Sequence, residues 1–459
     1  MADFDDESAG FDRRRLLRRG TTMLVGAAPF SGRDGLGIDR PPLPLPSVVN
    51  VVTDFGARGD GRTDDTRAFE TAYRCATSRI EEGVGRTVID IPPGNFLVKT
   101  PNALMNGTDP ERRANGLRFR GAGKRMTTIT FQPEAGPGSY LCRNEDMWAN
   151  VSFEKMQFRS ATPGASFFYS YSTGQAQDYR FRECEWMGEW EYGLALDGTD
   201  TNSEMRWEAC RVGGSYRRAF LYSGLSQRSR QPKSQDQFLN YWFHDMKVEY
   251  EWGNFLEFPY GGSITCQGGS YIITGRRPTD STEHGRNSMF FCFPVGQHHD
   301  SVQRFHAQDI RFEVRDPDVL VIDCAWQGGT VSFDNCDDTA LAFKNFSSEV
   351  RPHRYAIGPR GPLIRYDSCQ LVGRHEYRPS RPAESIPRTV RYDMCLLRSH
   401  RQSDFVVAQN LDRTPFVTFV DCLDNPAAPT RPTPSPAAAP TPPGPAPGAA
   451  TDRPVGPTP

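Results

Sequence analysis

An aromatic residue followed three positions later by Cys or Met recurs through most of this sequence. The clear copies are Phe153 with Met156, Phe181 with Cys184, Trp207 with Cys210, Phe243 with Met246, Phe333 with Cys336, Tyr366 with Cys369, Tyr392 with Cys395 and Phe419 with Cys422. A longer gap in the middle is filled by two degenerate copies, Cys266 with Gly269 and Phe305 with Gln308. Ten copies, most of them about 26 to 36 residues apart, are typical of a solenoid, in which each repeat stacks on the one before it.

The apolar positions inside one repeat indicate which solenoid forms. Around Phe181 they are Tyr179, Phe181, Cys184 and Trp186, so alternation holds on both sides but slips by one residue between Phe181 and Cys184. Successive side chains of a β-strand point to opposite faces, so apolar residues at every second position mark the buried face. A shift of this pattern by one residue marks the point where the strand turns a corner. A second apolar run follows in most repeats: Leu194–Leu196, Ala219–Tyr222, Phe255–Phe258, Met289–Phe293, Val319–Ile322 and Ala340–Phe343. No helical pattern longer than one turn fits between these runs, so the sequence predicts an all-β fold, a parallel β-helix of about ten or more coils.

The composition favours a soluble protein and argues against two classes of partner. Hydrophobic residues make up 37% of the 459 residues, and the formal net charge is −2 at pH 7. The chain therefore has no overall basicity that would argue for a nucleic-acid partner, and no apolar run approaches the length that spans a membrane. The 11 cysteines include no C-x-x-C pair, and six of them share one inward repeat position. That placement predicts a stacked ladder of buried thiols, in preference to disulfides or metal ligands.

The two ends of the chain differ from the repeats. The segment from Asp12 to Arg18, DRRRLLR, is followed by a weakly apolar run from Thr21 to Phe30 and resembles a twin-arginine export signal. This resemblance implies an exported protein, extracellular or on the cell surface; a disordered basic tail is the alternative. Residues 1–46 are assigned to the export-signal-like segment and a linker. Residues 426–459, rich in Pro, Ala, Thr and Gly, are assigned to a disordered tail.

A second pattern lies between the linker and the repeats. Residues Val51 to Thr66 read VVTDFGARGDGRTDDT, and Thr87 to Gly94, Gly121 to Gly123 and Thr128 with Ile129 continue the pattern. It resembles the opening of the pectate-lyase-like superfamily, which includes polysaccharide lyases, glycosidases and phage tailspikes. The resemblance implies a right-handed, single-stranded parallel β-helix and leaves the reaction open.

Residues 47–150 are therefore the predicted N-terminal cap and first coils, and residues 151–425 are the predicted main β-helix. Glycines on both sides of Asp60 predict a tight turn, and Thr63 or Asp64 is expected to cap a helix. The helix has one apolar stripe, formed by Phe69, Ala72, Tyr73, Ala76 and Ile80. We expect it to end before Gly83 and to cover the open end of the solenoid. Asp60, Asp64 and Asp65 are assigned to turn and cap roles and not to a metal site.

If the aromatic residue of each repeat points inward, its two neighbours form two columns on the surface. The column after it reads Glu154, Arg182, Glu208, His244, Gln267, His306, Asp334, Asp367 and Asp393. The column before it reads Ser152, Arg180, Arg206, Trp242, Thr265, Arg304, Ser332, Arg365 and Arg391. In the last repeats, where Arg365 stands beside Asp367 and Arg391 beside Asp393, ordinary surface ion pairs are the simpler interpretation.

The middle repeats combine side chains that suit a polysaccharide site. The candidate catalytic residues, for proton transfer, are Glu208, His244, Asp245, His306 and Asp309; the candidate substrate-binding residues are Arg206, Trp242 and Arg304. Arg pairs with uronate carboxylates, Trp stacks on sugar rings, and His or a carboxylate transfers the proton. Carboxylates two coils apart also come near the separation of roughly 6.5–9.5 Å that inverting hydrolysis needs.

Two long insertions, 223–237 and 275–288, are expected to form one wall of a groove beside these residues. Ordinary exposed surface is the alternative interpretation.

Two further clusters rank lower. Asp337 and Asp338 resemble the paired aspartates of polygalacturonase-like glycosidases, but the other signatures of those enzymes are absent, and a turn is the favoured interpretation. The run His298-His299-Asp300 has a metal-like composition, yet adjacent residues on a strand face opposite ways. No metal site is predicted.

These observations predict an exported carbohydrate-active protein that cleaves a polysaccharide, acidic or neutral and with a uronate-containing chain as one option, as a lyase or a hydrolase. The alternative is a non-catalytic glycan-binding adhesin or tailspike-like surface protein, because no complete catalytic signature is present. A purely structural rod is third. The expected partner is a polysaccharide. No cofactor is predicted, calcium would be expected only of a lyase, and the oligomeric state is left open, with a trimer as one option.

Overall fold

The computed structural model describes residues 48–77, 87–112, 114–145, 149–173, 178–198, 202–224, 238–278, 287–294, 302–339, 350–380, 389–398, 400–408 and 416–424. The export-signal-like segment, the linker and the Pro-rich tail lie outside this part, so their assignments stay predictions. The run His298-His299-Asp300, the apolar run 340–343 and most of the two long insertions also lie outside it.

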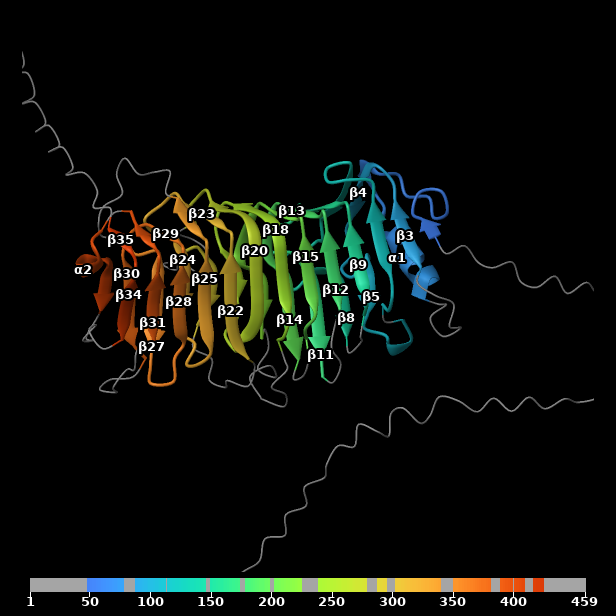
Figure 1. Cartoon of the computed structure of the whole chain (residues 1–459). Helices are drawn as coiled ribbons and strands as arrows, with labels where there is room; N and C mark the ends of the chain where they lie inside the picture. The colour runs from blue at the N-terminus through green and yellow to red at the C-terminus, as the bar shows by residue number, and fades with distance from the viewer. Residues whose placement is uncertain are drawn as a thin grey trace, which may run out of the picture. The chain divides into compact units, whose positions relative to one another are not determined.

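The strands stack side by side in parallel, coil after coil (Figure 1). They form a 24-stranded sheet, which contains two ladders, and an 11-stranded sheet, which is the third ladder. The first ladder contains β1 (Val48–Asn50), β3 (Val88–Ile91), β6 (Arg118–Gly121), β9 (Val151–Glu154), β12 (Tyr179–Arg182), β15 (Met205–Glu208), β18 (Tyr241–Tyr250), β20 (Gly262–Ile273), β22 (Gln303–Gln308), β25 (Thr330–Asp334), β28 (Leu363–Asp367), β31 (Val390–Asp393) and β34 (Val417–Val420).

The second ladder shares β18 and β20 with the first, because these two long strands run across the corner. Its other strands are β2 (Asp60–Asp64), β4 (Gly94–Val98), β7 (Thr127–Phe131), β10 (Gln157–Ser160), β13 (Glu185–Met187), β16 (Arg211–Val212), β23 (Arg311–Val314), β26 (Asp337–Thr339), β29 (Gln370–Leu371), β32 (Leu396–Leu397) and β35 (Leu423–Asp424).

The third ladder contains β5 (Met105–Gly107), β8 (Tyr140–Glu145), β11 (Ser166–Ser172), β14 (Glu189–Gly198), β17 (Ser215–Ser223), β19 (Asn254–Glu257), β21 (Met289–Phe293), β24 (Leu320–Cys324), β27 (His353–Ile357), β30 (His375–Pro379) and β33 (Val406–Ala408). These strands include the described second apolar runs. Every pairing between these strands is parallel, and from β3 to β33 the chain visits the three ladders in turn, coil after coil. The predicted all-β parallel β-helix is confirmed.

The corner between the first and second ladders is a single residue in the left-handed conformation. The corner residues are Lys155, Glu183, Ala209, Asp245, Gly268, Asp309, Asn335, Ser368, Met394 and Asp421, with φ between 49° and 69°. A single left-handed residue switches which face of the strand the following side chains point to, without an added loop. This explains why the aromatic residue and the Cys three positions later both point inward. Asp, Asn and Gly tolerate this conformation best.

The aromatic residues of successive coils form one interior file, as predicted. Ring centroids are 4.8 Å apart for Phe119–Phe153, 5.3 Å for Phe153–Phe181, 5.3 Å for Phe181–Trp207 and 4.4 Å for Trp207–Phe243, with the rings nearly parallel. The file resumes at Phe333–Tyr366 (5.0 Å), Tyr366–Tyr392 (5.1 Å) and Tyr392–Phe419 (4.9 Å).

The cysteines stack beside this file. In each of the six ladder positions the Sγ atom lies 3.3 to 3.6 Å from the backbone oxygen of the inward residue in the previous coil. None of these thiols forms a disulfide, and burial contributes to raising the pKa of Cys184 well above its ordinary value. The predicted stack of thiols is confirmed; five of the six are buried, and Cys422, in the last coil, is half-buried.

One repeat was placed wrongly in the sequence. Phe305 pairs with Ile264 and Val331, whereas Ala307 pairs with Cys266 and Phe333 and therefore occupies the position expected of Phe305. Both residues point inward because they are two apart on one strand, so alternation alone does not distinguish them. The corner at Asp309, followed by the buried Ile310, fixes the register.

The helix α1 (Thr66–Thr77) lies at the N-terminal end of the stack (Figure 1) and packs against β1, β3 and β5. Its buried face includes Phe69, Ala72, Tyr73 and Ala76, as the apolar stripe predicted; that it covers the open end stays a prediction. The structure also contains a short 3-10 helix, Pro110–Arg112, and a one-turn helix, α2 (Gln402–Phe405).

The three aspartates before α1 have the turn and cap roles that the sequence predicted. Asp60 accepts hydrogen bonds from the backbone N–H groups of Thr63 and Arg62, and these bonds lower its pKa to about 2. Asp64 accepts from the backbone N–H of Thr66 at 3.1 Å, and the buried Asp65 accepts from the backbone N–H of Arg58 at 2.6 Å.

Candidate functional site

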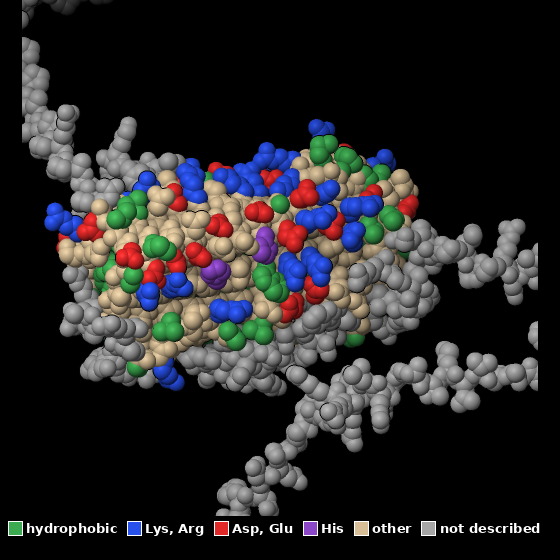
Figure 2. Space-filling view, in the orientation of Figure 1, with side chains coloured by type: hydrophobic (Ala, Val, Ile, Leu, Met, Phe, Trp, Pro, Cys, Tyr) green, Lys and Arg blue, Asp and Glu red, His purple; other side chains and the backbone are tan. Residues whose placement is uncertain are grey.

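The outward face of the first ladder carries most of the predicted site residues. Arg206 and Glu208 are exposed on β15, and Trp242 and His244 are half-buried on β18. The register pairs Arg206 with Trp242 and Glu208 with His244, so each pair lies on adjacent coils, about 4.8 Å apart along the stack. Figure 2 shows this face, with histidine side chains near its middle and charged side chains around them.

One printed contact and the strand register define how these four residues lie. The guanidinium carbon of Arg206 lies 4.4 Å from the centre of the Trp242 ring, a cation–π contact. Glu208 and His244 point outward from paired positions. Within the described part of the chain, neither Arg206 nor Glu208 forms an ion pair. Both remain available to a ligand.

A hollow of about 460 Å³ begins at Arg206 and Glu208 and extends toward the N-terminal coils. Its charged lining residues are Arg118, Arg180, Arg182, Arg206, Glu154 and Glu208. Glu154 is held between Arg118, at 3.3 Å, and Arg182, at 3.8 Å. We call these six residues the charged hollow. The sequence interpretation centred the site on later coils and missed Arg118, which precedes the repeats; the outward position of Arg118 on its strand was the available signal.

His306 and Arg304 lie farther along the face than predicted. Because of the corrected register, His306 pairs with Thr265 and Ser332. It thus falls in the column of Trp242, two coils away, and not in the column of Glu208 and His244. Its Nδ1 atom lies 2.8 Å from Ser332 Oγ, and Arg304 donates a hydrogen bond to Ser263 Oγ at 2.7 Å. Neither residue lines the charged hollow.

Asp245 and Asp309 are corner residues, with φ of 52° and 55°. Asp309 Oδ1 accepts a hydrogen bond from Asn335 Nδ2, at the next corner, at 2.7 Å. A corner role therefore accounts for both residues, and the structure gives no contact that draws them into the charged hollow.

Asp337 and Asp338 do not form a pair. Asp337 lies 3.5 Å from the guanidinium of Arg398 on the outside of β26, whereas Asp338 is buried and contacts His353 inside the coil. Adjacent residues on a strand face opposite ways, so the geometry contradicts the interpretation of two aspartates acting together.

The interior contact of Asp338 belongs to a buried polar cluster that the sequence interpretation missed. His353 Nε2 lies 2.9 Å from Asp338 Oδ2, and the imidazoles of His353 and His375 stack with their centres 4.2 Å apart. Burial, reinforced by the nearby His353 and His400, lowers the pKa of His375 well below its ordinary value.

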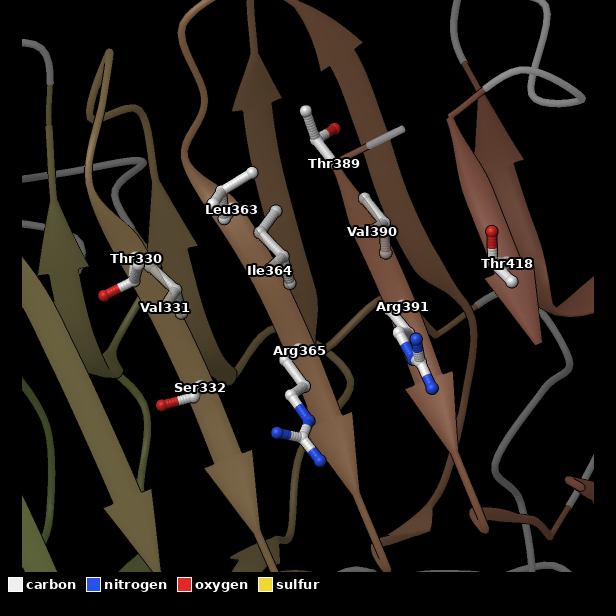
Figure 3. A pocket seen from close by; sticks show the side chains of 10 residues that line it. All are labelled: Thr330, Val331, Ser332, Leu363, Ile364, Arg365, Thr389, Val390, Arg391 and Thr418. Carbon is white, nitrogen blue, oxygen red and sulfur yellow. The ribbon is translucent and has the colours of Figure 1, made fainter. Parts of the chain in front are cut away.

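A second hollow, of about 600 Å³, lies over β25, β28, β31 and β34 (Figure 3). Among the described residues, its charged lining consists of Arg365 and Arg391. Arg365 pairs with Asp367, and Arg391 pairs with Asp393 at 2.7 Å. These are the surface ion pairs that the sequence predicted, and no carboxylate or imidazole of the described part of the chain lines this hollow. It is a weaker candidate than the charged hollow.

Among the described residues, no helix has the length and apolar character needed to cross a membrane.

Comparison with known proteins supports the family resemblance. Residues 48–172 match a family model described as "Rhamnogalacturonase A/epimerase, pectate lyase-like". Over 99 residues the chain is 36% identical to the preneck appendage protein of Bacillus phage PZA, a match that covers 22% of this chain and 9% of that protein. The chain thus spans only a small part of this curated relative.

Solved structures similar to this chain have low sequence identity to it. The A-module of the mannuronan C-5 epimerase AlgE6 of Azotobacter vinelandii is 12% identical, with a TM-score of 0.45, covering 83% of this chain and 100% of that one. The tailspike protein gp49 from Acinetobacter baumannii bacteriophage Fri1, a capsular polysaccharide depolymerase, is 10% identical, with a TM-score of 0.44, covering 81% of this chain and 57% of that one.

Proposed function

We propose that this parallel β-helix, whose residues 48–172 match a pectate-lyase-like family model, binds and cleaves an acidic polysaccharide along the charged hollow. The observation that carries the proposal is the charged hollow itself, which gathers four arginines and two glutamates on one outward face. The matched family, described as rhamnogalacturonase A/epimerase, is consistent with a carbohydrate substrate.

The arginines suit a chain that bears carboxylates. Arg presents a planar fork of donors that pairs with a carboxylate through two hydrogen bonds. Arg180, Arg182 and Arg206 lie on the adjacent strands β12 and β15, where the register sets Arg180 against Arg206. Successive acidic sugars lying across the strands would meet these guanidinium groups in turn. Arg206, stacked on Trp242, gives the site a flat polar and aromatic edge for a sugar ring.

The proton-transfer groups are Glu208 and His244. They occupy paired positions on neighbouring coils, so both reach one glycosidic bond or one ring proton. Glu154 lies two coils from Glu208 in the same column, about 9.6 Å away by coil spacing. That separation is close to the roughly 6.5–9.5 Å of inverting hydrolysis. In β-elimination, Arg182 or Arg206 would stabilise the uronate carboxylate while His244 or Glu208 removes the proton.

Product analysis on a panel of uronate-containing and neutral polysaccharides tests this proposal. We expect products from the uronate-containing chains only. Unsaturated ends would identify elimination, and new reducing ends without unsaturation would identify hydrolysis. Parallel reactions with and without a chelator show whether elimination needs calcium.

Absence of both products and binding on the panel would contradict the proposal. Retention on an immobilised acidic glycan without products would remove the catalytic half and favour the alternative, a glycan-binding surface protein. The same charged hollow would serve that role. Export by the twin-arginine-like segment, which would place the protein where such glycans occur, is part of the same proposal.

A further inference from the structure

We propose that Asp338, His353 and His375 form a site for a zinc-like divalent metal ion inside the C-terminal half of the β-helix. One oxygen of the aspartate and one nitrogen of each histidine lie within 4.8 Å of one another. The three residues are 2%, 1% and 0% exposed, respectively. Two imidazoles and one carboxylate are a ligand set that zinc commonly takes.

The two histidines are oriented in the same way by tyrosines of the first ladder. The hydroxyl of Tyr366 lies 2.9 Å from His353 Nδ1, and the hydroxyl of Tyr392 lies 2.8 Å from His375 Nδ1. The register repeats this arrangement, because His353 pairs with His375 and Tyr366 with Tyr392. With both Nδ1 atoms engaged, the Nε2 atoms are the candidate ligands, and that of His353 already lies 2.9 Å from Asp338 Oδ2. Such fixing of the far ring nitrogen is typical of metal-binding histidines.

The cluster is incomplete without a further partner. His375 Nε2 is buried and has no hydrogen-bond partner. In the part of the chain that the structure describes, the carboxylate of Asp338 contacts only His353 and no Lys or Arg. A buried carboxylate with an imidazole as its one hydrogen-bond partner among the described residues, and a buried nitrogen without a partner, both gain from a bound cation. One divalent ion would satisfy both.

The proton balance can be met by the residues present. To bind a metal, His353 Nε2 must give up its hydrogen bond to Asp338. A neutral His353 can hold its proton on Nδ1 and donate it to the oxygen of Tyr366, whose hydroxyl then donates to Tyr355, its present partner. No proton leaves in this case, whereas a protonated His353 would release one. The ligand atoms would close to roughly 3.3 Å from one another, because zinc lies about 2.0–2.2 Å from nitrogen and oxygen ligands.

Metal analysis of the full chain tests this inference. The protein would be produced in medium supplemented with zinc, because a buried site is loaded most readily during folding, then treated with a chelator and desalted. Elemental analysis is expected to show about one zinc ion per chain. Protein produced with cobalt should show the visible absorption of a Co²⁺ ion with nitrogen and oxygen ligands.

Two ligand variants and one control locate the ion. His375→Gln and Asp338→Asn are expected to lower metal content at least about 10-fold, and Tyr392→Phe to weaken binding by a similar factor through loss of orientation. His306→Gln removes a surface histidine and should keep the ion. A folded wild-type chain without zinc or cobalt would overturn the inference, as would full metal content in His375→Gln. If the ligand variants do not fold, the metal content of the wild type and of Tyr392→Phe decides.

Discussion

Replacing Glu208 by Gln is expected to lower kcat on the preferred acidic glycan by about 100-fold or more. Gln keeps the size and polarity of the side chain but cannot transfer the proton. Because Glu208 is exposed and forms no ion pair among the described residues, the stability of the fold should be unchanged. Initial rates on the glycan identified by product analysis, with circular dichroism as the check on folding, provide the measurement.

Asp334→Asn is the matched control for this prediction. Asp334 stands in the same outward column as Glu208, and the register reaches it through His244, Gln267 and Gln308. The substitution removes one carboxylate from the same face outside the charged hollow, so kcat should remain near the wild-type value. Equal loss in both variants, or full activity in Glu208→Gln, would exclude Glu208 as the proton-transfer group.

Replacing Trp207 by Ala should cost about 3–5 kcal/mol of the free energy of unfolding. Trp207 is fully buried, and its ring lies between those of Phe181, at 5.3 Å, and Phe243, at 4.4 Å. The cavity would interrupt the interior file in the middle of the stack, where each coil is stabilised by its neighbours. Denaturant unfolding of the two proteins measures the difference.

Trp242→Ala is the control for stability, since Trp242 stands on the neighbouring coil but points outward. Its loss removes a surface cation–π contact with Arg206, worth about 0.5–1 kcal/mol. Similar losses in the two variants would contradict the placement of Trp207 in the interior file.

The sequence was sufficient for the fold because its signals are local. The aromatic and Cys positions lie three residues apart within each coil, and the left-handed corner accounts for the parity slip between them. The position of Phe305 was wrong because Phe305 and Ala307 both face inward, and an aromatic residue is the more obvious match to the pattern. Asp309, a residue type that favours the left-handed corner, was the better guide to the register.

The candidate site was less predictable, because its residues meet across coils. Arg206, Glu208, Trp242 and His244 were found from their outward columns. Arg118 was missed because it precedes the repeats, although it joins the charged hollow through Glu154. The buried cluster was missed for another reason: Asp338, His353 and His375 come from three strands, β26, β27 and β30, on two ladders. No spacing in the sequence brings them together.

The most direct test of the central claim is a crystal structure of the Glu208→Gln variant with an oligosaccharide of the cleaved acidic glycan. The account predicts sugar rings across β9, β12 and β15, with uronate carboxylates paired to Arg182 or Arg206 and one glycosidic bond beside residue 208. Sugar bound instead in the hollow over β25, β28 and β31, or bound away from the first ladder, would contradict it.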